Sequence, residues 1–156
     1  MTIESAIQRF CNYQERSHKE VRNKLYELGC NQTEVEQHIT NLIEQDLVNE
    51  ERYARAYARG KFRIKGWGRI KIIHHLKQQQ ISAYCITSGL KEIDQEEYYQ
   101  RLMSLARRKY EELSGASHKG LKKQKTLRYL LQRGFETSLI TEALLEIIQD
   151  PSQVSD

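Results

Sequence analysis

Hydrophobic residues recur along most of this chain at intervals of three and four, which is the spacing of one face of an α-helix. Ile3, Ala6, Ile7 and Phe10 form the first such face and predict a helix over residues 3–13. Similar short stretches follow one another to the end of the chain, separated by glycines and polar turns. The pattern predicts a chain of consecutive helices.

Helix starts are marked by side chains that can accept hydrogen bonds from free backbone amides. Two capping boxes, Ser17–Glu20 and Thr33–Glu36, each open a predicted helix, and Asn49 opens the next one. Later in the chain Ser82 and Asp94 have the same role. These positions predict where five helices begin.

Glycines and polar turns mark the helix ends. Gly29 and Gly134 are suited to the left-handed conformation that stops a helix. The run Gly66-Trp67-Gly68 predicts a break, one helix ends near Gln80, and residues 114–120 form a predicted polar loop.

The chain also contains an internal repeat. Leu25, Leu76 and Leu130 serve as anchors, spaced 51 and 54 residues apart. Apolar residues stand five, ten and fourteen places beyond each anchor: Cys30, Ile81 and Phe135; Val35, Ile86 and Ile140; Ile39, Leu90 and Leu144. Leucines in any helical protein align at some offset, but three aligned columns with matching caps make chance improbable. Stacked helical repeats give an elongated molecule, so we predict an elongated all-α fold of tandem three-helix repeats, three units with the last truncated.

The predicted boundaries follow from the repeat. They are an N-terminal helix at 1–16, a first repeat at 17–66, a second at 67–114, a truncated third at 115–150, and a tail at 151–156.

Composition narrows the class of protein. The single proline, Pro151, stands almost at the end, which favours a helical chain. No apolar run approaches the roughly 18 residues of a membrane span. Cys11, Cys30 and Cys85 are odd in number and far apart, so a disulfide framework and a zinc site are both disfavoured and a reducing cytoplasm is expected.

Charge is distributed unevenly along the chain. The net charge of +4 divides into −5 for residues 1–51, +10 for residues 52–91 and −1 for residues 92–156. The middle segment contains ten basic residues and no Asp or Glu. Such asymmetry is typical of proteins that bind a polyanion or an acidic protein surface. A solvated basic face balanced by the acidic N-terminal third explains the charge alone equally well.

The sequence contains no catalytic signature that we can identify. The phosphate-binding glycine loop, the G-x-S-x-G nucleophile motif and zinc-spaced cysteines are all missing. His74 and His75 are adjacent on a predicted helix, so their side chains point about 100° apart and cannot chelate one metal well. We therefore expect a protein that is not an enzyme and needs no cofactor or metal.

Two pairs of short helices imitate a DNA-binding helix-turn-helix motif, at residues 21–43 and 127–148. Their second helices contain glutamates, whereas a recognition helix presents basic or amide side chains to the groove. Positive charge lies instead on the helix before and the helix after Gly66-Trp67-Gly68. Trp67, between two glycines in the basic segment, could stack on a base, although such residues more often pack internally.

The motifs together resemble the RecX family, bacterial regulators of the RecA recombinase. The resemblance covers about residues 6–148 and rests on four segments in order: Arg16–Val21 with Lys24 and Leu25, Asn49–Ala54, Arg63–Ile70, and Leu130–Phe135. Asn49 departs from the acidic residue usual there, and Gln80 replaces a frequent glycine. A non-glycine at that position must adopt positive φ at some cost or end the helix differently.

The resemblance implies a fold of tandem three-helix repeats and a function without catalysis. Such proteins bind RecA in the groove of its DNA filament and block filament extension, strand exchange, ATP hydrolysis and the co-protease activity of the SOS response. The implied partners are the RecA nucleoprotein filament and, more weakly, single- and double-stranded DNA, with no membrane. A cytoplasmic monomer is expected. The alternatives are a helical protein that binds DNA or RNA without RecA, and a scaffold for an acidic protein.

Basic residues are the candidates for these contacts. Arg16, Glu20 and Arg52 match family motifs, but capping or ion-pair roles within the chain are expected for them. Changing Arg63, Lys65 and Arg69 together to Ala is expected to weaken inhibition. The candidate RecA- and DNA-binding residues are Arg55, Arg59, Lys61, Arg63, Lys65, Trp67, Arg69, Lys71, Arg107, Arg108, Lys122 and Lys123.

Overall fold

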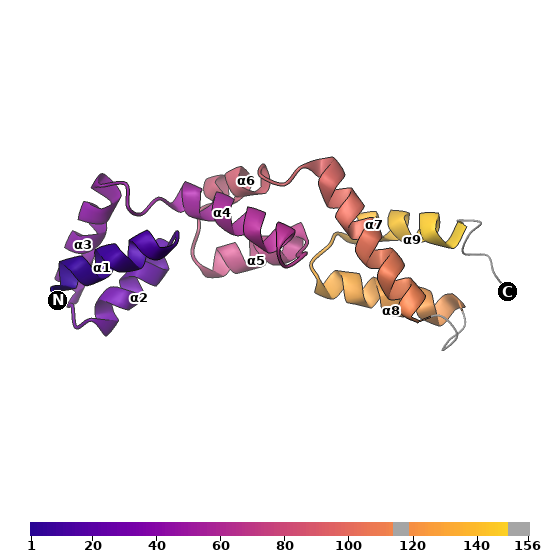
Figure 1. Ribbon diagram of the computed structural model, residues 1–156, viewed down its shortest axis with the longest axis horizontal. Helices are drawn as coiled ribbons and strands as arrows, with labels where there is room; N and C mark the ends of the chain where they lie inside the picture. Colours follow the sequence, from indigo (N-terminus) through magenta and orange to yellow (C-terminus); the bar gives the residue numbers. More distant parts are fainter. Residues whose placement is uncertain (114–118, 150–156) are drawn as a thin grey trace. The chain divides into compact units, whose positions relative to one another are not determined.

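The computed structural model describes residues 1–113 and 119–149, and all regular structure within them is helical, as predicted (Figure 1). The helices are α1 (Ile3–Tyr13), α2 (His18–Glu27), α3 (Gln32–Glu44), α4 (Glu50–Arg63), α5 (Arg69–Gln78), α6 (Ala83–Leu90), α7 (Gln95–Glu112), α8 (Lys119–Gln132) and α9 (Thr137–Gln149).

The predicted polar loop at 114–120 is partly wrong. Lys119 and Gly120 form the first turn of α8, because the lysine-rich segment that follows favours helix. Residues 114–118 lie outside the described residues, as do Asp150 and the tail at 151–156.

One predicted helix start is wrong by two residues. The cap of α3 is Asn31, not Thr33: its side chain accepts from the Glu34 amide at 2.9 Å, and its own amide donates to the Glu34 carboxylate at 3.0 Å. Asparagine caps at least as well as threonine, and Glu34 stands three residues after Asn31, where a capping box needs its acid.

The other predicted caps are confirmed. Ser17 and Glu20 exchange both hydrogen bonds of the capping box, each at 3.1 Å. Asn49, Ser82 and Asp94 accept from the amide three residues later, at 2.9, 3.2 and 2.9 Å. Since a good cap contributes about 1 kcal/mol, these side chains fix where α2, α4, α6 and α7 begin.

The same turn ends α2, α5 and α8, which confirms the sequence repeat. The residue four places beyond each anchor leucine is left-handed, with φ of 97° at Gly29, 62° at Gln80 and 96° at Gly134. The next amide donates to the anchor's carbonyl: Cys30 to Leu25 at 3.1 Å, Ile81 to Leu76 at 3.1 Å, and Phe135 to Leu130 at 3.2 Å. This pairing is the Schellman stop, and Gln80 adopts the strained conformation expected of a non-glycine there.

The chain divides into two compact units. The first contains residues 1–59 and 74–92, and the second contains residues 60–73 together with those from 93 onward.

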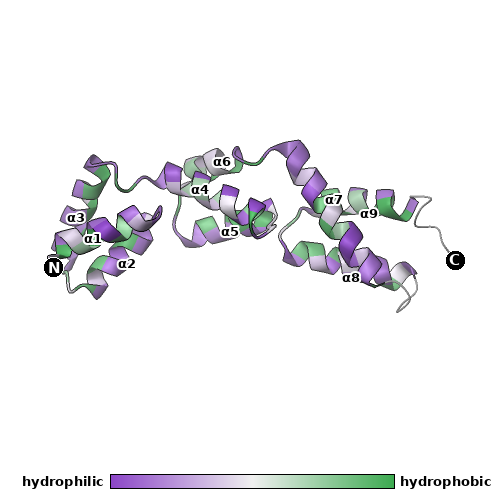
Figure 2. Ribbon diagram, in the orientation of Figure 1, coloured by the Kyte–Doolittle hydropathy of each residue, from purple (hydrophilic) through white to green (hydrophobic). Residues whose placement is uncertain are grey.

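In the first unit, α1, α2 and α3 share one core (Figures 1 and 2). The first helix, placed apart from the repeats in the sequence analysis, contributes Ile7 and Cys11 to it, with Phe10 packed alongside. The other buried members are Val21, Leu25, Cys30, Val35, Ile39, Leu42 and Val48. Burial raises the thiol pKa values of Cys11 and Cys30, while Cys85 is only half-buried.

In the second unit, α7, α8 and α9 pack on one another around Leu102, Leu130 and Leu144. Tyr98 is the centre of an aromatic group, with ring centroids 5.6 Å from Phe62 and 5.2 Å from Phe135. Through these contacts the end of α4 is fixed to α7 and to the turn before α9.

Candidate functional site

The loop between α4 and α5 is fixed by backbone contact with the turn between α8 and α9. Gly68 donates its amide to the Arg133 carbonyl at 2.7 Å, and Ile70 donates to the Gly134 carbonyl at 2.9 Å. A Cβ on Gly68 would lie 2.3 Å from the Gly134 carbonyl carbon, so only glycine permits this approach. Two motifs whose bonded residues stand 65 and 64 positions apart in the chain therefore form one structural joint.

Arg69 lies inside this joint and is engaged within the protein. Its guanidinium pairs with the Glu136 carboxylate at 2.8 Å and lies 3.9 Å over the Tyr98 ring. Its backbone amide donates to the Tyr98 hydroxyl at 2.9 Å, and that hydroxyl donates to Glu136. Burial, with the hydrogen bond to Glu136, raises the Tyr98 pKa. The structure thus gives Arg69 a packing role that the sequence analysis did not foresee.

Three lysines and the only tryptophan are carried by the segment that this joint fixes. The ammonium groups of Lys61 and Lys71 lie 4.9 and 4.4 Å from the centroid of the half-buried Trp67 ring. Lys65 is exposed in the loop between them. We call Lys61, Lys65, Trp67 and Lys71 the loop cluster. Cation–π contacts of this kind keep the charges beside an aromatic surface.

The predicted arginines of α4 are already paired with acids. The pairs are Arg55 with Glu51 at 2.7 Å, Arg59 with Glu92 at 3.4 Å, and Arg63 with Glu97 at 3.6 Å. All three arginines are exposed. These glutamates lie on either side of residues 52–91, the segment that contains no acid. Counting charges along the sequence therefore overstated the excess of positive charge on this segment. Exposed pairs of this kind contribute little stability and can exchange partners.

Four further candidates lie on α7 and α8, away in sequence from the loop cluster. Arg108 and Lys123 are exposed. Arg107 and Lys122 are half-buried, and the Lys122 ammonium lies 4.0 Å from the Tyr110 ring centroid. All four belong to the same compact unit as the loop cluster.

Sequence reasoning missed Arg101 and Arg133. Arg133 donates from Nη2 to the Lys65 carbonyl at 2.6 Å. Both guanidinium groups face Gly66, where an added Cβ would meet Arg133 Nη2 at 2.7 Å and Arg101 Nη2 at 3.0 Å. Arg133 belongs to a recognised motif, but nothing in its neighbours along the chain indicates a contact with residue 65.

Arg52 and Arg16 have the roles expected of them within the chain. Arg52 pairs with Glu15 at 2.7 Å and with Asp46 at 3.1 Å. Arg16 lies 3.9 Å from Glu20 and stacks on Phe10 at 3.8 Å.

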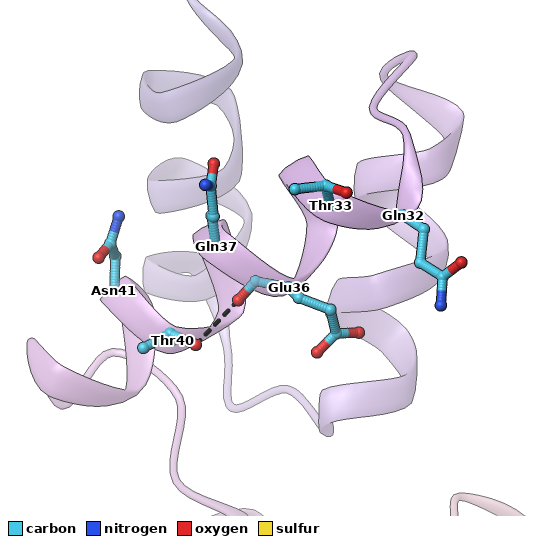
Figure 3. A pocket seen from close by; sticks show the side chains of 6 residues that line it. All are labelled: Gln32, Thr33, Glu36, Gln37, Thr40 and Asn41. Carbon is cyan, nitrogen blue, oxygen red and sulfur yellow. Dashed lines mark hydrogen bonds between the residues drawn. The ribbon is translucent and has the colours of Figure 1, made fainter.

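A shallow hollow on α3 is polar and open (Figure 3). Its exposed side chains come from two adjacent rows of one helix, and the acid among them, Glu36, pairs with Arg22 at 3.3 Å. The lining residues are Gln32, Thr33, Glu36, Gln37, Thr40 and Asn41. These amides and hydroxyls contain no nucleophile–base pair.

Within residues 1–113 and 119–149, no three or more His, Cys, Asp or Glu residues are placed to hold a metal ion. In that same part of the chain, no helix is long and apolar enough to cross a membrane.

Fold and surface together define an all-α protein of three-helix repeats with a basic, tryptophan-containing loop. Comparison with known families gives two matches: "RecX, second three-helix domain" covers residues 49–90, and "RecX, third three-helix domain" covers residues 95–144. The chain belongs to the RecX family, and relatives that match it carry the name regulatory protein RecX.

Individual relatives agree. The chain is 34% identical to regulatory protein RecX of Clostridium perfringens over 78% of its length, and 33% identical to that of Clostridium acetobutylicum over 86%. It spans only 57% and 64% of those proteins. The crystal structure of RecX from Lactobacillus salivarius superposes with a TM-score of 0.83 at 25% identity, covering 94% of both chains.

The matched domains group the helices as α4–α6 and α7–α9. This grouping starts one helix earlier than the repeats predicted at 67–114 and 115–150. With α1–α3 sharing a core, each described group contains three helices.

Proposed function

We propose that this chain binds a RecA-type recombinase on its DNA filament and inhibits filament extension and ATP hydrolysis without catalysis of its own. The observation that carries the proposal is the loop cluster, in which two lysines lie against one tryptophan and a third, exposed lysine stands two residues before it, on a segment fixed by the Gly68–Gly134 joint. Membership of a family of regulatory proteins supports the inhibitory role.

The charges of the loop cluster suit a polyanion. Among the residues that the structure describes, no ion pair engages the ammonium groups of Lys65 and Lys71. Each phosphate contact by a lysine releases counterions from the nucleic acid, so binding through this cluster weakens as salt increases. Arg55, Arg59 and Arg63 can add contacts by exchanging their surface carboxylates for phosphates.

The protein is expected to bind the filament through many weak contacts. Electrostatic complementarity speeds encounter with the filament and fixes orientation more than it adds affinity. A regulator bound along the filament blocks addition of recombinase subunits, and this explains how amounts below the DNA-site count can inhibit.

The test is the single-stranded-DNA-dependent ATP hydrolysis of RecA, with this protein titrated in at substoichiometric amounts. Changing Lys61, Lys65 and Lys71 together to Gln is expected to weaken inhibition at least tenfold and to reduce its salt dependence. Arg69 is excluded from the variant, because its loss would leave Glu136 without its ion-pair partner. A matched control changes three basic residues of the first unit to Gln: Arg9, Lys77 and Lys91.

The lysine variant must retain the helical circular-dichroism signal of the wild type. Full inhibition by a folded lysine variant would refute the assignment. An unchanged ATPase with wild-type protein, together with salt-sensitive binding to bare DNA, would instead show a nucleic-acid-binding protein that acts without RecA.

A further inference from the structure

Two arginines from different helices converge on one glycine of the basic loop. Arg101 comes from α7 and Arg133 follows α8, and both extend to Gly66. An added Cβ at Gly66 would lie 2.7 Å from Arg133 Nη2 and 3.0 Å from Arg101 Nη2. Since both distances start from one point, the two nitrogens lie within about 6 Å of each other, where like charges repel.

The structure provides no acid to balance this pair. Glu97 stands one turn before Arg101 on α7, but it pairs with Arg63 at 3.6 Å. Glu136, three residues after Arg133, pairs with Arg69 at 2.8 Å. Within residues 1–113 and 119–149, no carboxylate forms an ion pair with Arg101 or Arg133.

The hydrogen-bonding capacity of the pair is also unfilled. Arg133 uses Nη2 on the Lys65 carbonyl, while its Nε is buried and has no partner. Arg101 lines a hollow of about 400 Å³ together with Phe62, Gln100, Ser104 and the ion-paired Arg63 and Glu97. Buried polar atoms are normally hydrogen-bonded, so the unpartnered Nε of Arg133 marks this arrangement as incomplete.

We propose that Arg101 and Arg133, at Gly66, form a binding site for a phosphate group, and that its source is the backbone of a nucleic-acid strand. Planar guanidinium groups match the geometry of phosphate oxygens and can bind them in pairs. The absence of a side chain at Gly66 leaves space for both arginines beside the backbone. The assignment of this phosphate to a nucleic-acid strand rests on the proposed function.

The adjacent loop cluster favours a strand over an isolated anion. Lys65 precedes Gly66 and Trp67 follows it, so further cations and an aromatic ring lie next to the site along the chain. Single-stranded nucleic acids are bound by such combinations of phosphate contacts with an aromatic surface.

The experiment uses the full chain and its only tryptophan as a reporter. Trp67 fluorescence is followed while inorganic phosphate, or a short oligothymidylate, is added at constant ionic strength. Wild-type protein is expected to respond to both ligands, with far higher apparent affinity for the oligonucleotide. Arg101→Gln is expected to abolish the phosphate response and to reduce by about one the slope of log affinity against log salt for the oligonucleotide. Arg9→Gln removes the same charge from an exposed position of α1 and is expected to change neither.

Arg101 donates no hydrogen bond to the described residues, so its substitution tests binding with little risk to folding. If Arg101→Gln binds phosphate and oligonucleotide as the wild type does, the site is overturned, even where the lysine variant loses inhibition of RecA. If the wild-type protein responds to inorganic phosphate but Arg101→Gln leaves the salt slope for the oligonucleotide unchanged, the proposal that the phosphate belongs to a nucleic-acid strand is overturned. Loss of both responses in Arg101→Gln, with a RecA ATPase that the wild-type protein leaves unchanged, supports the site and refutes the proposed function.

Discussion

Replacing glycine by alanine at two equivalent turns separates backbone strain from steric packing. Gly29 and Gly134 both end a helix in the left-handed conformation, at φ of 97° and 96°. A Cβ on Gly29 would meet nothing within 4 Å, whereas a Cβ on Gly134 would lie 2.3 Å from Lys71 Cβ and 2.7 Å from its backbone nitrogen. Any difference between the two variants therefore reports on the joint between α5 and the turn after α8.

The two costs can be worked out separately. Placing an L-residue in the left-handed region costs about 1 kcal/mol, so Gly29→Ala is expected to reduce the free energy of unfolding by about that amount. Gly134→Ala adds the overpacking of a close contact, about 1–3 kcal/mol, for a total of about 2–4 kcal/mol.

Gly60, inside α4, also has open space around it, and Gly60→Ala is expected to stabilise by up to about 1 kcal/mol.

The assay is urea unfolding followed by helical circular dichroism, with each transition fitted separately because the chain has two compact units. Equal destabilisation by Gly29→Ala and Gly134→Ala would show that the close approach at Gly134 relaxes without cost, and the tight joint would then be refuted. Gly134→Ala is also expected to weaken DNA binding, because the joint positions the loop cluster. Gly29→Ala is expected to leave DNA binding unchanged.

Three further predictions follow from the same structure. Gln80→Gly is expected to stabilise by about 0.5–1 kcal/mol in urea unfolding, because it removes left-handed strain at φ 62°. Tyr98→Phe is expected to destabilise by about 1–2 kcal/mol through the lost hydrogen bond to Glu136. Because the folded-state pKa of Tyr98 is raised, its contribution is complete below about pH 10 and is lost as pH rises further; the variant should therefore lose less stability than wild type in alkali. A thiol reagent is expected to modify half-buried Cys85 in the native protein before the two buried cysteines, as mass spectrometry of digests would show.

Local signals predicted the helices well. Ser17, Asn49, Ser82 and Asp94 cap helices because each hydrogen bond joins residues three apart in the chain. The error at Asn31 arose from two overlapping capping patterns, between which the sequence alone offers no choice. The repeat was visible because the same leucine and turn positions recur.

The candidate site was predicted only in part. The basic loop is a local feature, and the structure does gather Lys61, Trp67 and Lys71. Partners distant in the chain were hidden: Arg69 meets Glu136 across 67 residues, and Arg133 reaches Lys65 across 68. Charge counts along a sequence cannot separate a cation paired in this way from one that is available to a ligand.

The two compact units have a consequence for dissecting the protein. Because the first unit contains residues 1–59 and 74–92, the chain passes between units three times, twice within helices α4 and α5. No single cut yields both units whole. A fragment ending after α6 would retain residues 60–73 without Tyr98, which packs against Phe62, and without Phe135, which packs against Tyr98. Expression of isolated repeats is therefore expected to give aggregation-prone pieces, and function is better mapped by point substitutions in the whole chain.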